Sequence, residues 1–332
     1  MTDKTALITG ISGQDGSYLA ELLLGRGFEV YGVVRRPVTH HAINMTHLDD
    51  EIESIHSSFE LASLFEILDD VRPQEIYNFA GQTYVGKSWE MLDETVKASA
   101  IIPCDLLEAI ARIDRRIRFF QASSCEMFSA SWQDVISETT PLAPATPYGC
   151  AKAMAHNMVA CYRQKYGIYA VSGILFNHES PRRNDNFVSR KLVKQAVSIK
   201  LGREREIVLG NIEVVRDWSF APDVVTAIDR SMRLDAPSDF VICSGETHSV
   251  REMLEVVFDI LDLDLHDHLR IDKSLFRSGE APVIRGSNEK ARAMLGWQPK
   301  TLFRQMLQKM VAFEMALQTG TAKNFADERP FA

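Results

Sequence analysis

Apolar residues first form a short, mostly unbroken run at residues 5–9, then recur at helical spacing over residues 17–24. A third run, rich in β-branched and aromatic residues, covers residues 28–34. Unbroken short runs predict buried strands, whereas spacings of three and four residues predict a helix with one apolar face. Gly10 and Gly25 mark the turns between these segments. The pattern therefore predicts a strand, a tight turn, a helix and a second strand within the first 35 residues.

Further strand-like runs are separated by stretches with helical spacing, at residues 75–79, 117–121 and 169–175. This alternation is typical of a parallel sheet with helices on both faces, so we expect an α/β fold with a Rossmann-like, doubly wound sheet. After residue 176 the pattern becomes irregular, with short strands expected at 206–209 and 240–243. We therefore expect a Rossmann domain over residues 1–176. Residues 177–332 are expected to form a smaller C-terminal α/β lobe, mainly for substrate binding.

The composition of the 332-residue chain is that of a globular protein, with 45% apolar and 25% charged residues. Its 45 acidic and 37 Lys or Arg residues give a formal net charge of −8, so we expect no nucleic-acid partner. The sequence has neither a secretion signal nor an uncharged apolar run of about 18 residues. We therefore expect a cytoplasmic protein without a membrane partner. Its five cysteines share no metal-ligand spacing, and we expect no metal site.

Three glycines, Gly10, Gly13 and Gly16, lie between the first predicted strand and the first predicted helix. Glycines in this position let main-chain N–H groups and the helix N-terminus approach a pyrophosphate, so the loop predicts a dinucleotide site. The second strand ends at Arg35 and Arg36, where an NAD site would carry an acidic residue. Two cations suit a ribose 2′-phosphate, which favours NADP. The alternative is that both arginines are only solvated charges at a strand end.

Tyr148 and Lys152 have the spacing that places a phenol and an ammonium group on the same side of a helix. A nearby ammonium group stabilises a phenolate, which can then take a proton from a carbinol. Ser124 follows a central strand and could hydrogen-bond to the same carbinol oxygen. Glu126 adds an acid/base group that simple alcohol oxidation does not need, which indicates proton removal from a carbon beside a ketone. The alternative for Glu126 is an acidic residue that stabilises a helix start.

Longer strings carry a resemblance, at residues 9–21 (TGISGQDGSYLAE), 121–128 (QASSCEMF), 173–183 (GILFNHESPRR), 216–218 (RDW) and 295–297 (LGW). In these strings, and over nearly its whole length, the chain closely resembles the GDP-mannose 4,6-dehydratase family of the extended short-chain dehydrogenases/reductases. The resemblance implies a lyase with an internal redox cycle. Hydride passes from the sugar C4 to NADP⁺, water is lost across C5–C6, and the hydride returns to C6.

The resemblance also implies roles for individual residues. Tyr148 would be the base at O4, Lys152 its electrostatic partner, Ser124 a hydroxyl at O4, and Glu126 the C5 proton acceptor. Positions that match cofactor-contacting residues of the family are Gly10, Gly13, Gln14, Asp15, Gly16, Arg35, Arg36, Ala80, Tyr148, Lys152, His178 and Arg183. Positions that match residues holding the GDP-sugar are Ser88, Asn177, Lys191, Arg216, Arg277 and Glu280.

The chain also departs from the family pattern. Ser124 and Cys125 stand where the family usually has Thr and Ser, and Cys125 is the weaker hydrogen-bond donor. After Arg36 the chain lacks the serine-rich loop that helps the family to form tetramers, so we expect a homodimer or a loosely held tetramer. Near the adenine, Ser57 or a neighbour aligns with a Gly-Asp pair of the family, so an adenine contact is expected to be lost.

Two other functions remain open at this stage. Residues 80–83 (AGQT) and 284–286 (IRG) are similar to those of sister reductases of GDP-4-keto-6-deoxymannose. An NADP-dependent 4-ketoreductase or epimerase acting on a related nucleotide sugar is therefore the main alternative, with a GDP-heptose as another possible substrate. A catalytically inactive sensor on the same fold is the second alternative. Glu126 favours the dehydratase, since a reductase has no use for it.

Overall fold

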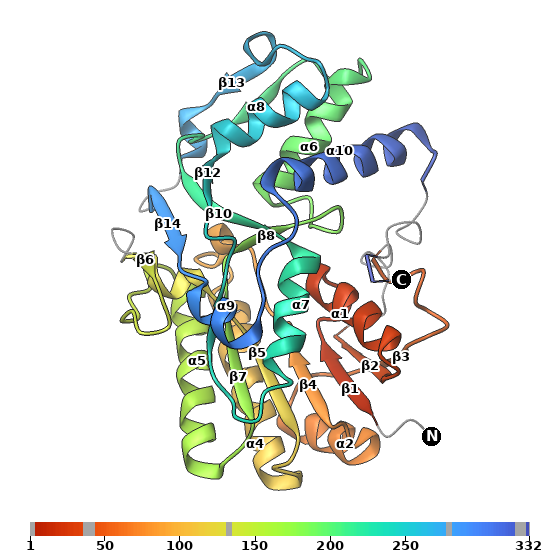
Figure 1. Cartoon of the computed structure of the whole chain (residues 1–332), viewed down its shortest axis with the longest axis vertical. Helices are drawn as coiled ribbons and strands as arrows, with labels where there is room; N and C mark the ends of the chain where they lie inside the picture. Colours follow the sequence, from red (N-terminus) through yellow and green to blue (C-terminus); the bar gives the residue numbers. More distant parts are fainter. Residues whose placement is uncertain (1–3, 36–43, 131–134, 277–280, 323–329, 332) are drawn as a thin grey trace.

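The structure is a computed structural model that describes residues 4–35, 44–130, 135–276, 281–322 and 330–331. A seven-stranded parallel sheet forms its larger part (Figure 1), in the order β11-β7-β5-β4-β1-β2-β3. The order reverses between β1 and β4, and in open α/β sheets the ligand crevice lies at such a point, beyond the carboxyl ends of the strands. The strand bounds are β1 Thr5–Thr9, β2 Glu29–Val34, β3 Glu53–His56, β4 Glu75–Asn78, β5 Arg118–Ser124, β7 Ala170–Leu175 and β11 Phe240–Ile242.

Helices cover both faces of this sheet because its central strands are apolar on both sides. Ala6 and Ile8 of β1 lie in one apolar cluster with helices α1 and α7, whereas Leu7 lies in a second cluster with α2, α4 and α5. This alternation follows the two-residue period of a strand. The helix bounds are α1 Gln14–Gly25, α2 Leu61–Val71, α3 Leu92–Val96, α4 Ile102–Ile113, α5 Pro147–Tyr166 and α7 Ala221–Ser231. The expected α/β fold is confirmed.

The smaller part contains a five-stranded sheet, with β12, β10, β14 and β6 in this order and β8 paired with β10. Above it, α6, α8 and α10 enclose a separate apolar cluster, beside the parallel pair β9 and β13 (Figure 1). Its strands are β6 Val135–Ile136, β8 Asn177–Glu179, β9 Ile207–Leu209, β10 Val215–Phe220, β12 Thr247–Ser249, β13 Leu269–Ile271 and β14 Val283–Gly286. Its helices are α6 Val188–Lys200, α8 Val250–Ile260 and α10 Phe303–Thr319.

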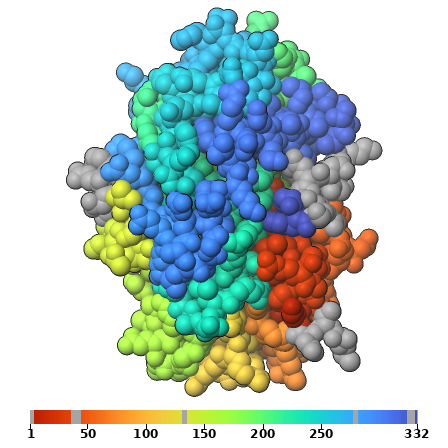
Figure 2. Space-filling view, in the orientation of Figure 1, coloured from red at the N-terminus to blue at the C-terminus, as the bar shows by residue number. Residues whose placement is uncertain are grey.

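The C-terminal half of the chain contributes to both parts. The strand expected at residues 240–243 forms β11, which pairs with β7 at the edge of the large sheet. Helix α9 (Glu289–Leu295) packs on β11 and α7, and Figure 2 shows the blue C-terminal residues extending down over the larger part. The division at residue 176 stays a prediction. Among the described residues, no helix has the length and apolar character needed to cross a bilayer.

Candidate functional site

In the glycine loop between β1 and α1, the backbone conformation and the close main-chain neighbours exclude residues with a side chain. Gly10 has a φ of +71°, and a Cβ atom there would lie 2.8 Å from the main-chain nitrogen of Ala80. A Cβ atom at Gly16 would lie 2.5 Å from the carbonyl oxygen of Gly10. The N–H of Gly13 donates to that same oxygen over 3.0 Å. The loop thus packs tightly between the end of β1, the main chain at Ala80 and the start of α1.

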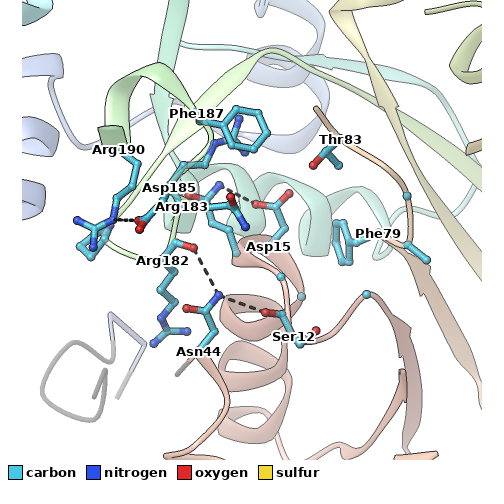
Figure 3. Close-up of a pocket in the computed structure, with 18 of the residues that line it drawn as sticks. Ser12, Asp15, Asn44, Phe79, Thr83, Arg182, Arg183, Asp185, Phe187 and Arg190 are labelled. Atoms are coloured by element: carbon cyan, nitrogen blue, oxygen red, sulfur yellow. Dashed lines mark hydrogen bonds and ion pairs between the residues drawn. The ribbon is translucent and has the colours of Figure 1, made fainter. Parts of the chain in front are cut away.

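A cavity of about 720 Å³ lies over this loop (Figure 3). Its walls are the glycine loop, residues 79–83 after β4, residues 181–187 after β8, and parts of α6 and α10. In Figure 3, Asn44 lies between Ser12 and Arg182 and donates to both main-chain oxygens, over 3.2 and 3.4 Å. A concave site of this volume at a switch point of the sheet is where α/β proteins bind cofactors.

Asp15 and His178 connect the start of α1 with β8. Nε2 of His178 lies 2.9 Å from a carboxylate oxygen of Asp15, and Nδ1 lies 2.6 Å from the carbonyl oxygen of Phe176. Burial lowers the pKa of His178, but the Asp15 carboxylate outweighs this effect, so the pKa lies above its ordinary value. The pKa of Asp15 is lowered, because His178 outweighs the opposing effect of burial. Both side chains are therefore held in fixed orientations beside the cavity.

Other predicted cofactor residues differ in how they relate to this cavity. Gly10, Gly13, Gln14, Asp15, Gly16, Ala80 and Arg183 line it. The guanidinium of Arg183 lies 3.5 Å from the ring centroid of Phe187, and its Nε is 3.1 Å from a carboxylate oxygen of Glu179. Arg35 instead forms an ion pair with Glu94, with Nη2 and Oε1 2.8 Å apart. Arg36 lies outside the described residues.

The structure brings Tyr148 and Lys152 together with Ser124, at the end of β5. Both residues of α5 are buried, with Tyr148 7% and Lys152 3% exposed. Lys152 Nζ donates to the carbonyl oxygen of Ala122 over 2.7 Å and lies 5.7 Å from the centroid of the Tyr148 ring. Burial raises the pKa of Tyr148, while a hydrogen bond with the Ser124 side chain acts in the opposite direction. Burial also lowers the pKa of Lys152 to about 8.

Glu126 follows directly in the turn after β5, where local hydrogen bonds hold it. The Ser124 hydroxyl accepts the N–H of Glu126 over 3.2 Å. Helix α5 begins close by, with the Thr146 hydroxyl accepting the N–H of Gly149 over 3.0 Å. The first turn of α5 packs directly on the Glu126 main chain at Gly149. Glu126 is half-buried and lines a second cavity, which faces the smaller part of the molecule.

This second cavity has a volume of about 570 Å³, and its wall combines aromatic, aliphatic and polar side chains. The aromatic residues in it are Tyr84, Trp89, Phe187 and Trp218. Phe187 also lines the first cavity, so the two cavities share a wall. No sequence motif identified these aromatic residues as part of a site. Tyr84 and Trp89 follow β4 at the carboxyl edge of the sheet, and this position alone could have indicated that they lie near a ligand site.

The predicted substrate residues are only partly brought together. Asn177 and Arg216 line the second cavity beside Glu126. Ser88 is buried, and its hydroxyl donates to the carbonyl oxygen of Val85 over 2.7 Å. Lys191 is exposed on α6 and is not one of the described residues that line this cavity. Arg277 and Glu280 lie outside the described ranges.

Cys125 is packed in the apolar interior. It is 4% exposed and belongs to an apolar cluster that includes Ile174, Phe176 and Val241. Burial raises the pKa of its thiol far above the ordinary range. Cys125 therefore acts as a small apolar side chain behind the turn that carries Glu126.

The chain matches the family model for GDP-mannose 4,6 dehydratase over residues 7–310. It is 41% identical to GDP-mannose 4,6 dehydratase 1 of Arabidopsis thaliana over 327 residues, which cover 95% of this chain and 90% of that protein. It is 36% identical to human GDP-mannose 4,6 dehydratase, over 95% of this chain and 92% of that protein. Among solved structures, the fold matches dTDP-glucose 4,6-dehydratase from Bacillus anthracis str. Ames in complex with NAD. That match has a TM-score of 0.82 and 21% identity, and covers 93% of this chain and 96% of the other.

Proposed function

The chain belongs to the GDP-mannose 4,6-dehydratase family, and from this premise we propose that it converts a GDP-hexose, GDP-mannose in the first place, into the 4-keto-6-deoxy product. The observation that carries the proposal is that four groups gather at the end of β5 and the start of α5, where Glu126 lines the second cavity. Ser124, Tyr148 and Lys152 are the set expected for oxidation at a carbinol carbon, and Glu126 is the additional base that dehydration needs. The alternative of a ketoreductase or epimerase is not favoured, since it leaves Glu126 without a task.

The first cavity suits a nicotinamide dinucleotide. At Gly10 and Gly16 the main chain is so crowded that no Cβ atom fits, and a glycine loop at a helix N-terminus lets main-chain N–H groups approach a pyrophosphate. Asp15, Ala80, His178 and Arg183 would complete the cofactor site. When bound, the nicotinamide would accept the hydride from the sugar C4 and supply the hydride that reaches C6.

We assign NADP rather than NAD on the strength of Arg35 and Arg36. Two arginines that directly follow β2 in the sequence would favour a 2′-phosphate by at least tenfold, which corresponds to about 1.4 kcal/mol. Calorimetric dissociation constants for NADP⁺ and NAD⁺ test this assignment. Equal constants would contradict it.

Tyr148 would act as the base at O4. Burial raises the pKa of Tyr148, and the hydrogen bond with Ser124 opposes this effect. Lys152, with Nζ 5.7 Å from the centroid of the phenol ring, would supply the positive charge that stabilises a phenolate. Ser124 would also bond to O4 and so hold the sugar hydroxyl beside the phenol. These groups act in the first step, which is the oxidation at C4.

Glu126 would act on the next step. A ketone at C4 acidifies the C5 proton, which a carboxylate within reach can remove. Loss of that proton together with the C6 hydroxyl amounts to one water. Glu126 lines the second cavity together with Asn177 and Arg216, and the guanidinium of Arg216 suits the diphosphate of a GDP-sugar. Roles for Ser88, Lys191, Arg277 and Glu280 in holding this substrate stay predictions.

The test is incubation of the purified protein with a panel of nucleotide sugars followed by mass spectrometry. We expect GDP-mannose to lose one water without added cofactor. Consumption of added NADPH, or a product of unchanged mass with inverted stereochemistry, would replace this proposal by a ketoreductase or an epimerase.

We further propose that the protein is a homodimer formed through the helices of its larger part. Leu92, Ile101 and Met154 are between 40% and 51% exposed and lie on α3, the turn at Lys97–Ile101, and α5, which pack against one another. Large exposed apolar side chains on adjoining helices are typical of an interface. Light scattering at micromolar concentration should give the dimer mass, and a stable tetramer would contradict the proposal.

A further inference from the structure

Glu94 and Arg35 form an ion pair at the end of β2. Nη2 of Arg35 lies 2.8 Å from Oε1 of Glu94, although the two residues are 59 positions apart in the chain. Glu94 belongs to the short helix α3, which follows β4. The glycine loop and Arg35 follow the neighbouring strands β1 and β2. Arg35 therefore occupies the place where Rossmann folds distinguish the ribose 2′ substituent.

The ion pair turns the Arg35 guanidinium toward α3. Among the described residues, neither Arg35 nor Glu94 is part of the wall of the first cavity. The two side chains are 50% and 39% exposed, so water has access to the pair and it is readily broken. Another anion can therefore replace the Glu94 carboxylate at Arg35, but the two anions compete for the same guanidinium group.

The competition affects only one of the two dinucleotides. A guanidinium group presents its donors in a planar fork that suits either a carboxylate or a phosphate. A 2′-phosphate that binds both terminal nitrogens of Arg35 has to displace Glu94 from Nη2, and it then lies near the carboxylate that it displaced. NAD carries a 2′-hydroxyl, so it neither needs the guanidinium nor suffers the repulsion.

We propose that Glu94 is a specificity-determining residue that weakens binding of the 2′-phosphate through its ion pair with Arg35, and so limits the preference for NADP over NAD. The proposal rests on the assignment of the first cavity to a nicotinamide dinucleotide. It uses no property of Arg36.

Calorimetry with NADP⁺ and NAD⁺ tests this on the wild type, Glu94→Gln and Asp93→Asn. Asp93 adjoins Glu94 in the first turn of α3, so its substitution changes the net charge equally but leaves the ion pair intact. Glu94→Gln should tighten NADP⁺ binding by roughly three- to tenfold and leave NAD⁺ binding within about twofold. Asp93→Asn should leave both within about twofold.

A double-mutant cycle identifies the partner. In an Arg35→Gln background, Glu94→Gln should no longer improve NADP⁺ binding. The inference is overturned if Asp93→Asn matches Glu94→Gln, if both dinucleotides gain equally, or if the gain persists without Arg35. Equal wild-type affinities with a gain of NADP preference in Glu94→Gln would uphold this inference while refuting the wild-type NADP assignment. Absence of binding of either dinucleotide to every variant would refute both.

Discussion

A Cβ atom at Gly149 would lie 2.5 Å from the main-chain oxygen of Glu126, closer than real Cβ contacts come. The absence of a side chain at this position allows the first turn of α5 to pack on the turn after β5. Tyr148 and Glu126 are thereby brought to the same end of the sheet, although they come from different elements. The proposed bases for O4 and C5 depend on this close approach.

Substitution of Gly149 by alanine should separate the two groups. We expect the free energy of unfolding to fall by about 1–3 kcal/mol, the usual cost of overpacking. Since misplacement by about 1 Å can cost a hundredfold in rate, we also expect kcat for dehydration to fall by roughly that factor. Steady-state kinetics and denaturant unfolding measure both effects. Gly25→Ala is the control, because its Cβ atom would have no neighbour closer than 3.9 Å. Wild-type kcat in Gly149→Ala would refute the proposed dependence.

Cys125→Ser tests whether the residue at this position serves packing or chemistry. The side chain lies in the apolar cluster with Ile174 and Phe176, so a hydroxyl there should lower the free energy of unfolding by about 1–2 kcal/mol. Because the thiol is buried within this apolar cluster, we expect kcat to stay within about threefold of the wild type. Cys161→Ser, at an exposed position of α5, is the matched control for stability. A large rise in kcat would show that Cys125 limits the chemistry.

The buried ammonium of Lys152 makes stability depend on pH. Its folded pKa is about 8, below the ordinary value of 10.5, so the unfolded chain binds more protons between these values. The free energy of unfolding of the cofactor-free protein should therefore rise with pH across this window, by up to roughly 3 kcal/mol from this one group. Lys152→Met should lack this rise, whereas the exposed Lys97→Met should keep it. Parallel pH profiles for the wild type and Lys152→Met would contradict the assignment.

The local pattern was sufficient to predict the elements that carry the cofactor loop. The run at residues 5–9 forms β1 with the predicted bounds, and the glycine spacing placed the turn correctly, because apolar periodicity and glycine geometry are local properties. The pairing of β11 with β7 was not predictable, since a three-residue apolar strand does not specify its neighbour.

The same limit applies to the site. The set of Ser124, Tyr148 and Lys152 was predicted from spacing and strand position. The aromatic residues of the second cavity were not predicted. Tyr84, Phe187 and Trp218 come from separate segments, and each by itself is typical of an ordinary core residue. The ion pair between Arg35 and Glu94 likewise depends on the tertiary fold and on no motif.

The most direct test of the account separates the two half-reactions in a single turnover of GDP-mannose by the protein loaded with NADP⁺. The near-ultraviolet absorbance of the reduced nicotinamide reports oxidation at C4, and quenched product analysis reports water loss. In Glu126→Gln the absorbance should still appear and accumulate, while dehydration falls by roughly a hundred- to ten-thousandfold, the usual contribution of a general base. In Tyr148→Phe the absorbance itself should be lost. If Glu126→Gln dehydrates the sugar at the wild-type rate, Glu126 is not the base at C5 and the central claim is wrong.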